Sequence, residues 1–350
     1  MEENDSVDKI LSYTLQEEDL QKTAGGLVNL VLKECVRVTG HEISAAKFIE
    51  DGITCEGEKI RVNERMSAGQ TLRIVLPEER DGQKLIPVEG PVRILYEDED
   101  LIAVDKAAGE VVHPCPGHYQ DTVANYLTWY LHKEQENREK EDCEKNSVDG
   151  NSTDGDRTRG WIQSKTPGEV RDQSGLRIIG RLDKETSGVL IFARNRAAAA
   201  RLQRQRQEGQ FVRTYVAVCE GTFRQESMTG IIDQDMEKIP GVLMKMHTCE
   251  NGTGLHAVTH YEVLEQDSDS NTSVVRCRIE TGRTHQIRVH MASIGHPLVG
   301  DTLYGSEASD TLDHVKSMAE GSAHALLTAV SVDCLQPFTG EKLHIASRTY

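Results

Sequence analysis

A nine-residue run, GRLDKETSG at residues 180–188, sets one carboxylate, Asp183, between the cationic side chains of Arg181 and Lys184. The run LRII precedes it and VLIFARN follows it, a pattern that predicts two short β-strands joined by a polar turn. Functional residues concentrate in loops that a rigid scaffold holds, and a carboxylate beside cations stays ionised. Two interpretations follow from these residues: an ion-paired turn aspartate, the commoner role, or a nucleophile or base.

A second polar run, TGRTHQIRVHMASIGHPLVG, occupies residues 281–300. It predicts a short helix that Thr284 caps and Gly295 ends, since Pro297 cannot continue it. Donor-bearing side chains crowd the first turns of this helix: Arg283, His285, Gln286, Arg288 and His290. Such a cluster suits a phosphate or a carboxylate better than solvent alone.

The two runs, in this order, resemble the signature motifs of the RluA-type pseudouridine synthases. The first is similar to that family's active-site motif HRLDKDTSG, with Gly180 in the place of the histidine. The segment VRTYVAVCEG at 212–221 is similar to the strand that carries the family's tyrosine, which falls on Tyr215. Residues 96–114, with Lys106 and His113, and residues 324–347 resemble the opening and closing segments, so the resemblance runs from about residue 92 to the C-terminus.

The resemblance implies an isomerase that converts uridines of RNA to pseudouridine, ribosomal RNA being favoured over transfer RNA. The reaction breaks a carbon–nitrogen glycosidic bond, turns the base and rejoins it through carbon 5. Asp183 would attack the anomeric carbon or remove a sugar proton, Arg283 would keep it ionised, and Tyr215 would stack on the uracil and take the carbon 5 proton. Arg181 would fill the gap that the flipped nucleotide leaves. The substrate-binding residues expected are Arg181, Lys184, Thr186, His285, Gln286, Arg288 and His113.

The fold class expected is α+β, in two domains. Residues 86–350 would form the catalytic domain, a large mixed, mainly antiparallel β-sheet flanked by helices and loops. Residues 1–85 resemble the small α/β RNA-binding domain that precedes the catalytic domain in many such synthases and also occurs in a small-subunit ribosomal protein. Within it, residues 45–52 predict a helix that Gly52 stops, and residues 84–91 predict a linker.

Charge is unevenly distributed along the chain. The formal net charge is −17, whereas an RNA-binding surface is expected to be basic. Residues 181–213 nevertheless contain eight basic and three acidic side chains, and 195–209 predicts a helix, capped by Asn195, that could track phosphates. The acidic excess lies instead in residues 134–156, so we expect a flexible insertion at about 134–173, after a helix at 121–133 capped by Asp121.

Several classes of protein find no support in the sequence. No apolar run reaches 18 residues and the N-terminus lacks a leader pattern, which predicts a cytoplasmic protein with no membrane contact, expected to be a monomer. Phosphate-binding glycine loops and metal-ligand spacings are missing, so we expect neither cofactor nor metal. Two alternatives stay open: a catalytically inactive RNA-binding or ribosome-assembly factor on the same fold, and a metal-dependent phosphoesterase using His285, His290 and Asp301.

Overall fold

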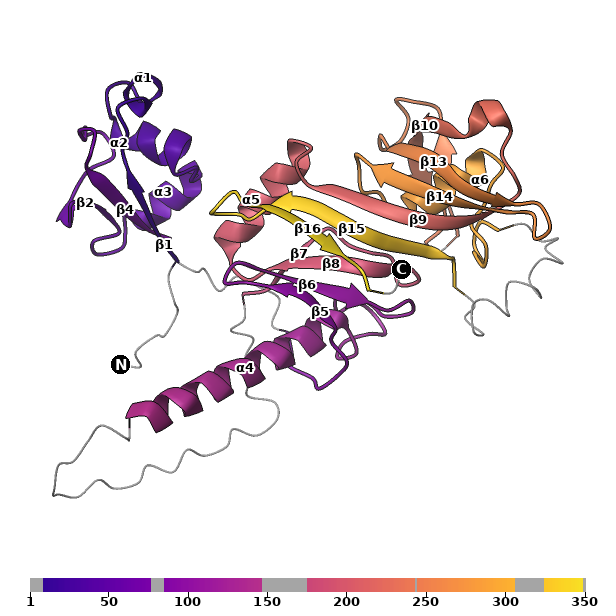
Figure 1. Ribbon diagram of the computed structural model, residues 1–350, viewed down its shortest axis with the longest axis horizontal. Coiled ribbons are helices and arrows are strands. Elements are labelled where there is room, and N and C mark those ends of the chain that lie inside the picture. Colours follow the sequence, from indigo (N-terminus) through magenta and orange to yellow (C-terminus); the bar gives the residue numbers. More distant parts are fainter. Residues whose placement is uncertain (1–8, 77–84, 147–174, 243, 306–323, 349–350) are drawn as a thin grey trace. The chain divides into compact units, whose positions relative to one another are not determined.

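The computed structural model describes residues 9–76, 85–146, 175–242, 244–305 and 324–348 (Figure 1). The chain divides into two compact units, Met1–Asp81 and Gly82–Tyr350. No helix among the described residues is long and apolar enough to cross a membrane.

The N-terminal unit is a four-stranded antiparallel sheet, in the order β1-β4-β2-β3, with short helices. Its elements are β1 (Lys9–Thr14), α1 (Asp19–Lys22), α2 (Val28–Leu30), the π-helical η1 (Val31–Cys35), α3 (Gly40–Ala46), β2 (Ile53–Cys55), β3 (Glu58–Lys59) and β4 (Thr71–Leu76). The helix expected at 45–52 is therefore wrong in position. Thr39 starts it earlier through a capping box, because its hydroxyl accepts from the Glu42 N–H at 3.2 Å while the Glu42 carboxylate accepts from the Thr39 N–H at 2.6 Å.

The second unit is built on one large sheet, whose ten described strands run in the order β10-β13-β14-β9-β15-β8-β6-β5, with β16 beside β15 and β7 beside β8. Among the described strands of this sheet, the one parallel pairing joins β15 to β8. Its elements, with the separate ribbon β11–β12, are β5 (Ile94–Glu97), β6 (Leu101–Lys106), α4 (Val123–Asn146), β7 (Arg177–Ile179), β8 (Ser187–Ala193), α5 (Arg196–Gln207), β9 (Val212–Glu220), η2 (Gln225–Ser227), β10 (Thr229–Asp233), β11 (Asp235–Lys238), β12 (Met246–Cys249), β13 (Val258–Asp267), β14 (Thr272–Ile279), α6 (Gln286–Ser293), β15 (Leu327–Leu335) and β16 (Lys342–Ala346). The expected fold class, a mixed and mainly antiparallel sheet with helices, is confirmed.

Alternation along β8 directs side chains to both faces of this sheet, because successive strand residues point in opposite directions. Leu190 and Phe192 pack in a core that includes Leu127 of α4. Val189 and Ile191 join a second core with α5. The two helices thus cover opposite faces, as Figure 1 shows, and the polar turn leads directly into β8 where this strand pairs with the start of β15.

Helix α4 is longer than the helix expected at 121–133, and it runs through the first part of the expected insertion at 134–173. Glutamate, lysine, glutamine and arginine are strong helix formers even where they bury nothing, and Lys133 pairs with Glu136 one turn away at 2.9 Å. The expected Asp121 cap is also wrong: its carboxylate contacts His118 Nδ1 at 2.6 Å, while the Thr122 hydroxyl bonds to Asn125 in the first turn. Residues 147–173 of the expected insertion lie outside the described residues.

Gly188 allows β15 to approach the Asp183 turn closely. Its φ is +104°, and a Cβ there would lie 2.2 Å from the Ala329 carbonyl oxygen, so no larger residue fits. Ala329 of β15 is paired with Gly188 on one side and with Tyr215 of β9 on the other. Strand β15 therefore sets the polar turn and the tyrosine strand at a fixed separation.

Candidate active site

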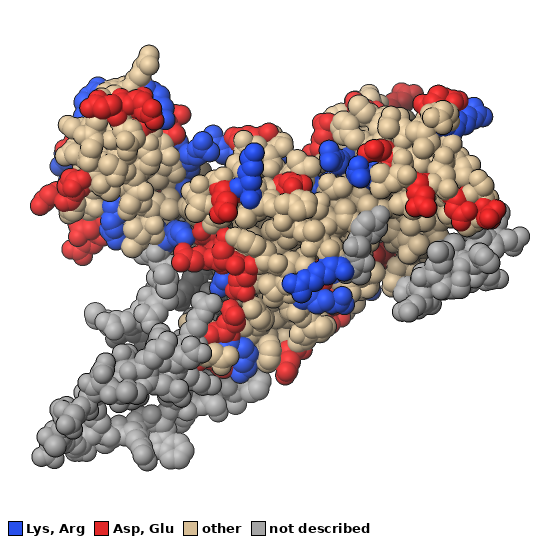
Figure 2. Space-filling model, in the orientation of Figure 1, with Lys and Arg blue, Asp and Glu red and all other residues tan. Residues whose placement is uncertain are grey.

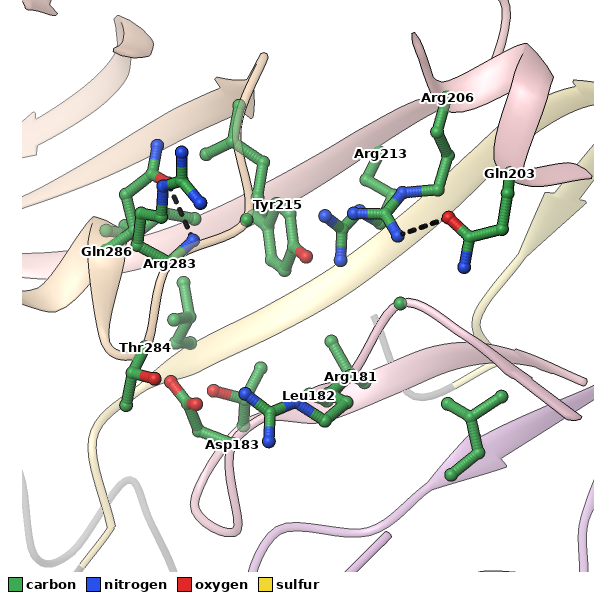
Figure 3. A pocket seen from close by; sticks show the side chains of 17 residues that line it. Arg181, Leu182, Asp183, Gln203, Arg206, Arg213, Tyr215, Arg283, Thr284 and Gln286 are labelled. Atoms are coloured by element: carbon green, nitrogen blue, oxygen red, sulfur yellow. Dashed lines mark hydrogen bonds between the residues drawn. The ribbon is translucent and has the colours of Figure 1, made fainter. Parts of the chain in front are cut away.

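One cavity of about 250 Å³ brings the two polar motifs together (Figure 3). The residues that carry polar chemistry in its wall are Arg181, Asp183, Thr186, Gln203, Arg206, Arg213, Tyr215, Arg283, Thr284 and Gln286. In Figure 3, Tyr215 lies between two polar ends of the cavity, with Arg283 and Gln286 at one end and Arg206 and Arg213 at the other. Asp183 and Arg181 lie across from Tyr215, so groups from three segments of the chain face one space.

Asp183 occupies the turn between β7 and β8, whose backbone closes through a hydrogen bond from Thr186 N–H to the Asp183 carbonyl at 3.1 Å. Within the described residues, its carboxylate has neither a hydrogen bond nor an ion pair. The first interpretation of the sequence, that Asp183 is an ion-paired residue of a turn, therefore finds no support among the described residues. A carboxylate that lines a cavity without a fixed partner is free to act on a bound molecule.

Lys106, at the end of β6, ties down the loop that bears Asp183. Its side chain is only 2% exposed, and Nζ donates to the carbonyl oxygens of Ala107 at 2.8 Å, Glu110 at 2.9 Å and Lys184 at 3.0 Å. Burial lowers its pKa to about 8, while the charges of Glu110 and Asp183 act in the opposite direction. The sequence placed Lys106 only in the opening segment and gave it no role at the site. Its position at the end of the apolar strand LIAVDK is the sequence signal that could have predicted a buried lysine.

Tyr215 is 4% exposed, and its ring presents itself to the cavity from β9. Burial raises the pKa of its phenol, with a smaller contribution in the same direction from Asp183 and an opposing one from Arg213. The phenol is therefore protonated at neutral pH and can donate a hydrogen bond.

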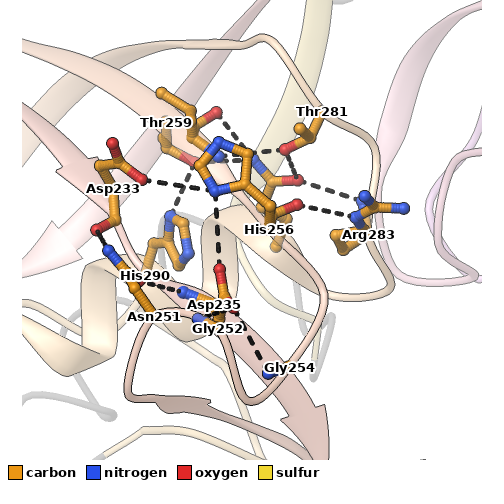
Figure 4. Close-up of polar contacts among 12 residues, drawn as sticks. Asp233, Asp235, Asn251, Gly252, Gly254, His256, Thr259, Thr281, Arg283 and His290 are labelled. Carbon is orange, nitrogen blue, oxygen red and sulfur yellow. Dashed lines mark hydrogen bonds and ion pairs between the residues drawn. The ribbon is translucent and has the colours of Figure 1, made fainter.

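Arg283 is held at the cavity edge by its backbone and by its side chain. Its N–H donates to Gln286 Oε1 at 3.0 Å, and its Nε donates to the His256 carbonyl at 2.9 Å. In Figure 4 the His256 imidazole lies beside Asp233 and Asp235, with Nδ1 3.6 Å and 3.5 Å from their carboxylates. Among the described residues, Arg283 forms no ion pair with Asp183, although both line the cavity.

Residues 100–293 match the family described as RNA pseudouridylate synthase. The chain belongs to this family. It is an RNA pseudouridine synthase, an isomerase.

Named relatives of the synthase span most of its length. "Ribosomal large subunit pseudouridine synthase D" of Zymomonas mobilis is 31% identical over 260 residues, 73% of this chain and 69% of the relative. A protein of the same name from Vibrio cholerae is 30% identical over 299 residues, 85% and 79% of the two chains. An "Uncharacterized RNA pseudouridine synthase" of Aquifex aeolicus is 30% identical over 297 residues, 84% and 81%.

Arg288 of the synthase is not placed to contact substrate, contrary to the expectation from the sequence. It is 1% exposed and donates from Nε and Nη2 to the two oxygens of Asp301, both at 2.7 Å, with Glu185 2.9 Å from Nη2. Bidentate carboxylate pairing uses the geometry that would otherwise bind phosphate. Arg288 therefore joins α6 to the Asp183 turn, which contains Glu185.

Gln286 and His285 are likewise buried, although Gln286 lines the cavity. The Gln286 amide is used within the protein: Oε1 accepts from Thr281 Oγ1 at 2.8 Å, and Nε2 donates to the Val258 carbonyl at 2.9 Å. His285 has φ +56° and takes the N-cap position of α6, so the expected Thr284 cap is wrong. The His285 Nδ1 contacts the Tyr304 hydroxyl at 2.9 Å, and burial lowers the pKa of its imidazole.

The other expected contacts surround the cavity at different depths. Arg181 is exposed, while Thr186 is buried, and both line the cavity. The Lys184 ammonium points elsewhere, 3.4 Å from His118 Nε2. His113 is half-buried, its Nδ1 has no hydrogen-bond partner among the described residues, and burial together with the charge of Arg181 lowers its pKa.

Arg206, Arg213 and Gln203 were not singled out from the sequence as site residues, although the two arginines belong to the basic stretch 181–213. The arginines of α5 have different surroundings: Arg201 lies over the Phe338 ring at 4.3 Å and Arg204 pairs with Glu208 at 2.8 Å, whereas Arg206 faces the cavity. On the face drawn in Figure 2, acidic and basic side chains are interspersed on a largely uncharged surface. Arginine side chains of this synthase are instead gathered in the wall of the cavity.

The metal-site alternative has no geometric support in the described part of the chain, where no three histidine, cysteine, aspartate or glutamate side chains are grouped to hold a metal ion. His290 is fully buried with Nδ1 3.0 Å from Thr259 Oγ1, and Asp301 is taken by Arg288. His285, His290 and Asp301 therefore have separate roles.

Proposed function

We propose that this synthase isomerises a uridine of ribosomal RNA, acting as a monomer in the cytoplasm, with Asp183 as the reacting carboxylate. Support for ribosomal RNA comes from the names of the Zymomonas mobilis and Vibrio cholerae relatives. The single observation that carries the residue roles is that Asp183, Tyr215 and Arg283 come from three separate segments and line one cavity.

Asp183 is suited to attack on the anomeric carbon or to removal of a sugar proton, because its carboxylate is unpartnered among the described residues and faces the cavity. Either route needs an ionised carboxylate. Arg283 is the cation that would orient Asp183 once substrate is bound, since its guanidinium is anchored through Nε to the His256 carbonyl. We keep both routes open.

Tyr215 would stack on the uracil. The raised pKa of its phenol favours this role over removal of the carbon 5 proton, because a base must first be deprotonated. Arg181 is exposed at the cavity and would occupy the space that the flipped nucleotide leaves in its RNA stack. His113, within electrostatic reach of Arg181, would contact the same nucleotide.

The test is to delete the gene, map pseudouridines in ribosomal and transfer RNA, and complement with the wild type or with Asp183→Asn. We expect a pseudouridine of ribosomal RNA to disappear, to return with the wild type and to stay absent with Asp183→Asn. A missing site in transfer RNA alone would refute the substrate, and full restoration by Asp183→Asn would refute the role of the carboxylate. Sedimentation of the purified protein checks the monomer.

A further inference from the structure

Two arginines at one end of the cavity, Arg206 of α5 and Arg213 of β9, have no acidic partner in the part of the chain that the structure describes. Arg213 is 8% exposed, yet its guanidinium has no hydrogen bond or ion pair within the described residues; it lies 6.0 Å from the centre of the Tyr215 ring. Arg206 donates to the neutral amide oxygen of Gln203 at 3.1 Å. Both guanidinium groups line the cavity.

This arrangement contrasts with that of two other arginines of the same unit. Arg194 pairs with Glu97 at 2.7 Å, and the buried Arg288 has Asp301 and Glu185. Burying a cation without a counter-charge is costly, and two neighbouring cations repel. Burial and the charge of Arg213 indeed lower the pKa of Arg206. An anion that entered the cavity would stabilise such a pair.

Two glycines, one from each motif, border the arginine pair. A Cβ on Gly180 would lie 3.1 Å from Arg213 Nη1, and a Cβ on Gly282 would lie 3.1 Å from Arg213 Nη2 and 3.3 Å from Arg206 Nη2. Gly180 also has φ +79°, a conformation that other residues rarely adopt. The glycine that departs from the HRLD pattern is thus a position at which a side chain would crowd the Arg213 guanidinium.

The chemistry of the missing anion follows from the rest of the cavity. Guanidinium forks bind phosphate oxygens in bidentate fashion. Asp183 and Tyr215 provide for the sugar and the base of one nucleotide, so the nearest anion of an RNA substrate is the phosphate beside that nucleotide. In Figure 3 the arginine pair lies on the far side of Tyr215 from Arg283, which leaves Arg283 for the reacting carboxylate.

We propose that Arg206 and Arg213 clamp the backbone phosphate next to the flipped uridine, and that Gly180 and Gly282 give their guanidinium groups the room to do so. The proposal rests on the proposed function in one respect, that RNA enters this cavity. In this proposal the two arginines bind the substrate phosphate, and Gly180 positions them.

The first experiment measures binding of uridine 5′-monophosphate and of uridine to the full-length protein by calorimetry at low salt. We expect the wild type to prefer the nucleotide about tenfold or more, since hydrogen bonds between charged groups are the strong ones. Arg213→Gln and Arg206→Gln should each reduce that preference, whereas the control Arg204→Gln, on the same helix but paired with Glu208, should keep it. The proposal is overturned if the wild type shows no preference for the phosphate or if Arg213→Gln retains it.

The second experiment follows pseudouridine formation on ribosomal RNA from the deletion strain. Arg213→Gln should raise KM about tenfold, leave kcat within about threefold and reduce the salt slope of binding by about 0.7–0.9. An effect on kcat alone, with unchanged KM and salt slope, would mean that Arg213 acts on Tyr215 and would overturn the clamp. Gly180→Ala should raise KM in the same way, and if it does not fold, the two arginine variants decide.

The two proposals fail in different ways. If the wild type forms no pseudouridine on this RNA, the proposed function fails, while the nucleotide-over-uridine preference still tests the clamp. If pseudouridine forms normally with Arg206→Gln and Arg213→Gln, the clamp fails and the proposed function stands.

Discussion

Replacement of the buried Lys106 by methionine should loosen the turn that carries Asp183. Lys106→Met keeps the length of the side chain but removes the ammonium group, which donates to three backbone carbonyls. Hydrogen bonds from a charged donor contribute about 1.5–3 kcal/mol each, so about 4.5–9 kcal/mol of gross interaction is lost. Burying the ammonium opposes this by about 3 kcal/mol, the equivalent of a pKa lowered from 10.5 to about 8. The free energy of unfolding should therefore fall by about 1.5–6 kcal/mol.

Activity should fall as well, because the carbonyl of Lys184, next to Asp183, loses its tie to β6. A displacement of about 1 Å in a catalytic group costs on the order of 100-fold in rate. Urea unfolding of the full chain measures the first effect, and pseudouridine formation at saturating RNA measures the second. The control is Lys133→Met, an exposed lysine paired with Glu136, which should change stability by less than about 0.5 kcal/mol. If Lys106→Met matches this control in both assays, the three-carbonyl anchor is not what holds the Asp183 turn.

The pH dependence of stability gives an independent check on Lys106. Its native pKa of about 8 lies below the ordinary value of 10.5, so between these pH values the unfolded chain holds a proton that the native protein has released. The free energy of unfolding should then rise with pH across this window, by up to about 3 kcal/mol, relative to Lys106→Met. A decrease across the same window would contradict the burial of the ammonium.

Two further substitutions test the cavity and its support. Tyr215→Phe should keep most of kcat if the ring stacks on uracil, whereas Tyr215→Leu should lose at least tenfold; equal large losses would show that the hydroxyl does essential chemistry. Arg288→Met should lower the free energy of unfolding by about 3–5 kcal/mol, because it leaves the buried Asp301 carboxylate and the half-buried Glu185 carboxylate without their cation. Calorimetric unfolding measures this effect, with Arg204→Gln as the exposed ion-pair control, and a loss as small as the control's would refute the buried triad.

Local sequence was sufficient for the elements that flank Asp183. The apolar runs on either side of the polar turn are the strands β7 and β8. A short apolar run bounded by turn residues is typical of a buried strand. The length of α4 could not be read in the same way, since the acidic segment after residue 134 looked too polar to order itself. Helix propensity, which needs no buried face, extends the helix to Asn146.

For the second motif, the sequence did not show which side chains are used within the protein. The sequence predicted that His285, Gln286 and Arg288 bind substrate, yet Gln286 and Arg288 form hydrogen bonds within the protein. The residues from Gln286 to Met291 are all buried, and of these Gln286 and Ile287 reach the cavity wall. Arg283 lies at the cavity because it precedes the helix.

The sequence by itself determined the chemical groups of this synthase and their order: a carboxylate in a polar turn, a tyrosine on a strand and a cluster of basic donors. Those are local properties of side-chain type and chain pattern. Only the tertiary structure decided which charges are neutralised by the protein, because Asp301 and Glu185 reach Arg288 from elsewhere in the chain while Arg206 and Arg213 have no carboxylate partner among the described residues. Coulomb interactions act through space. Whether a charged side chain is available to RNA therefore depends on its neighbours in the fold, which the linear sequence does not reveal.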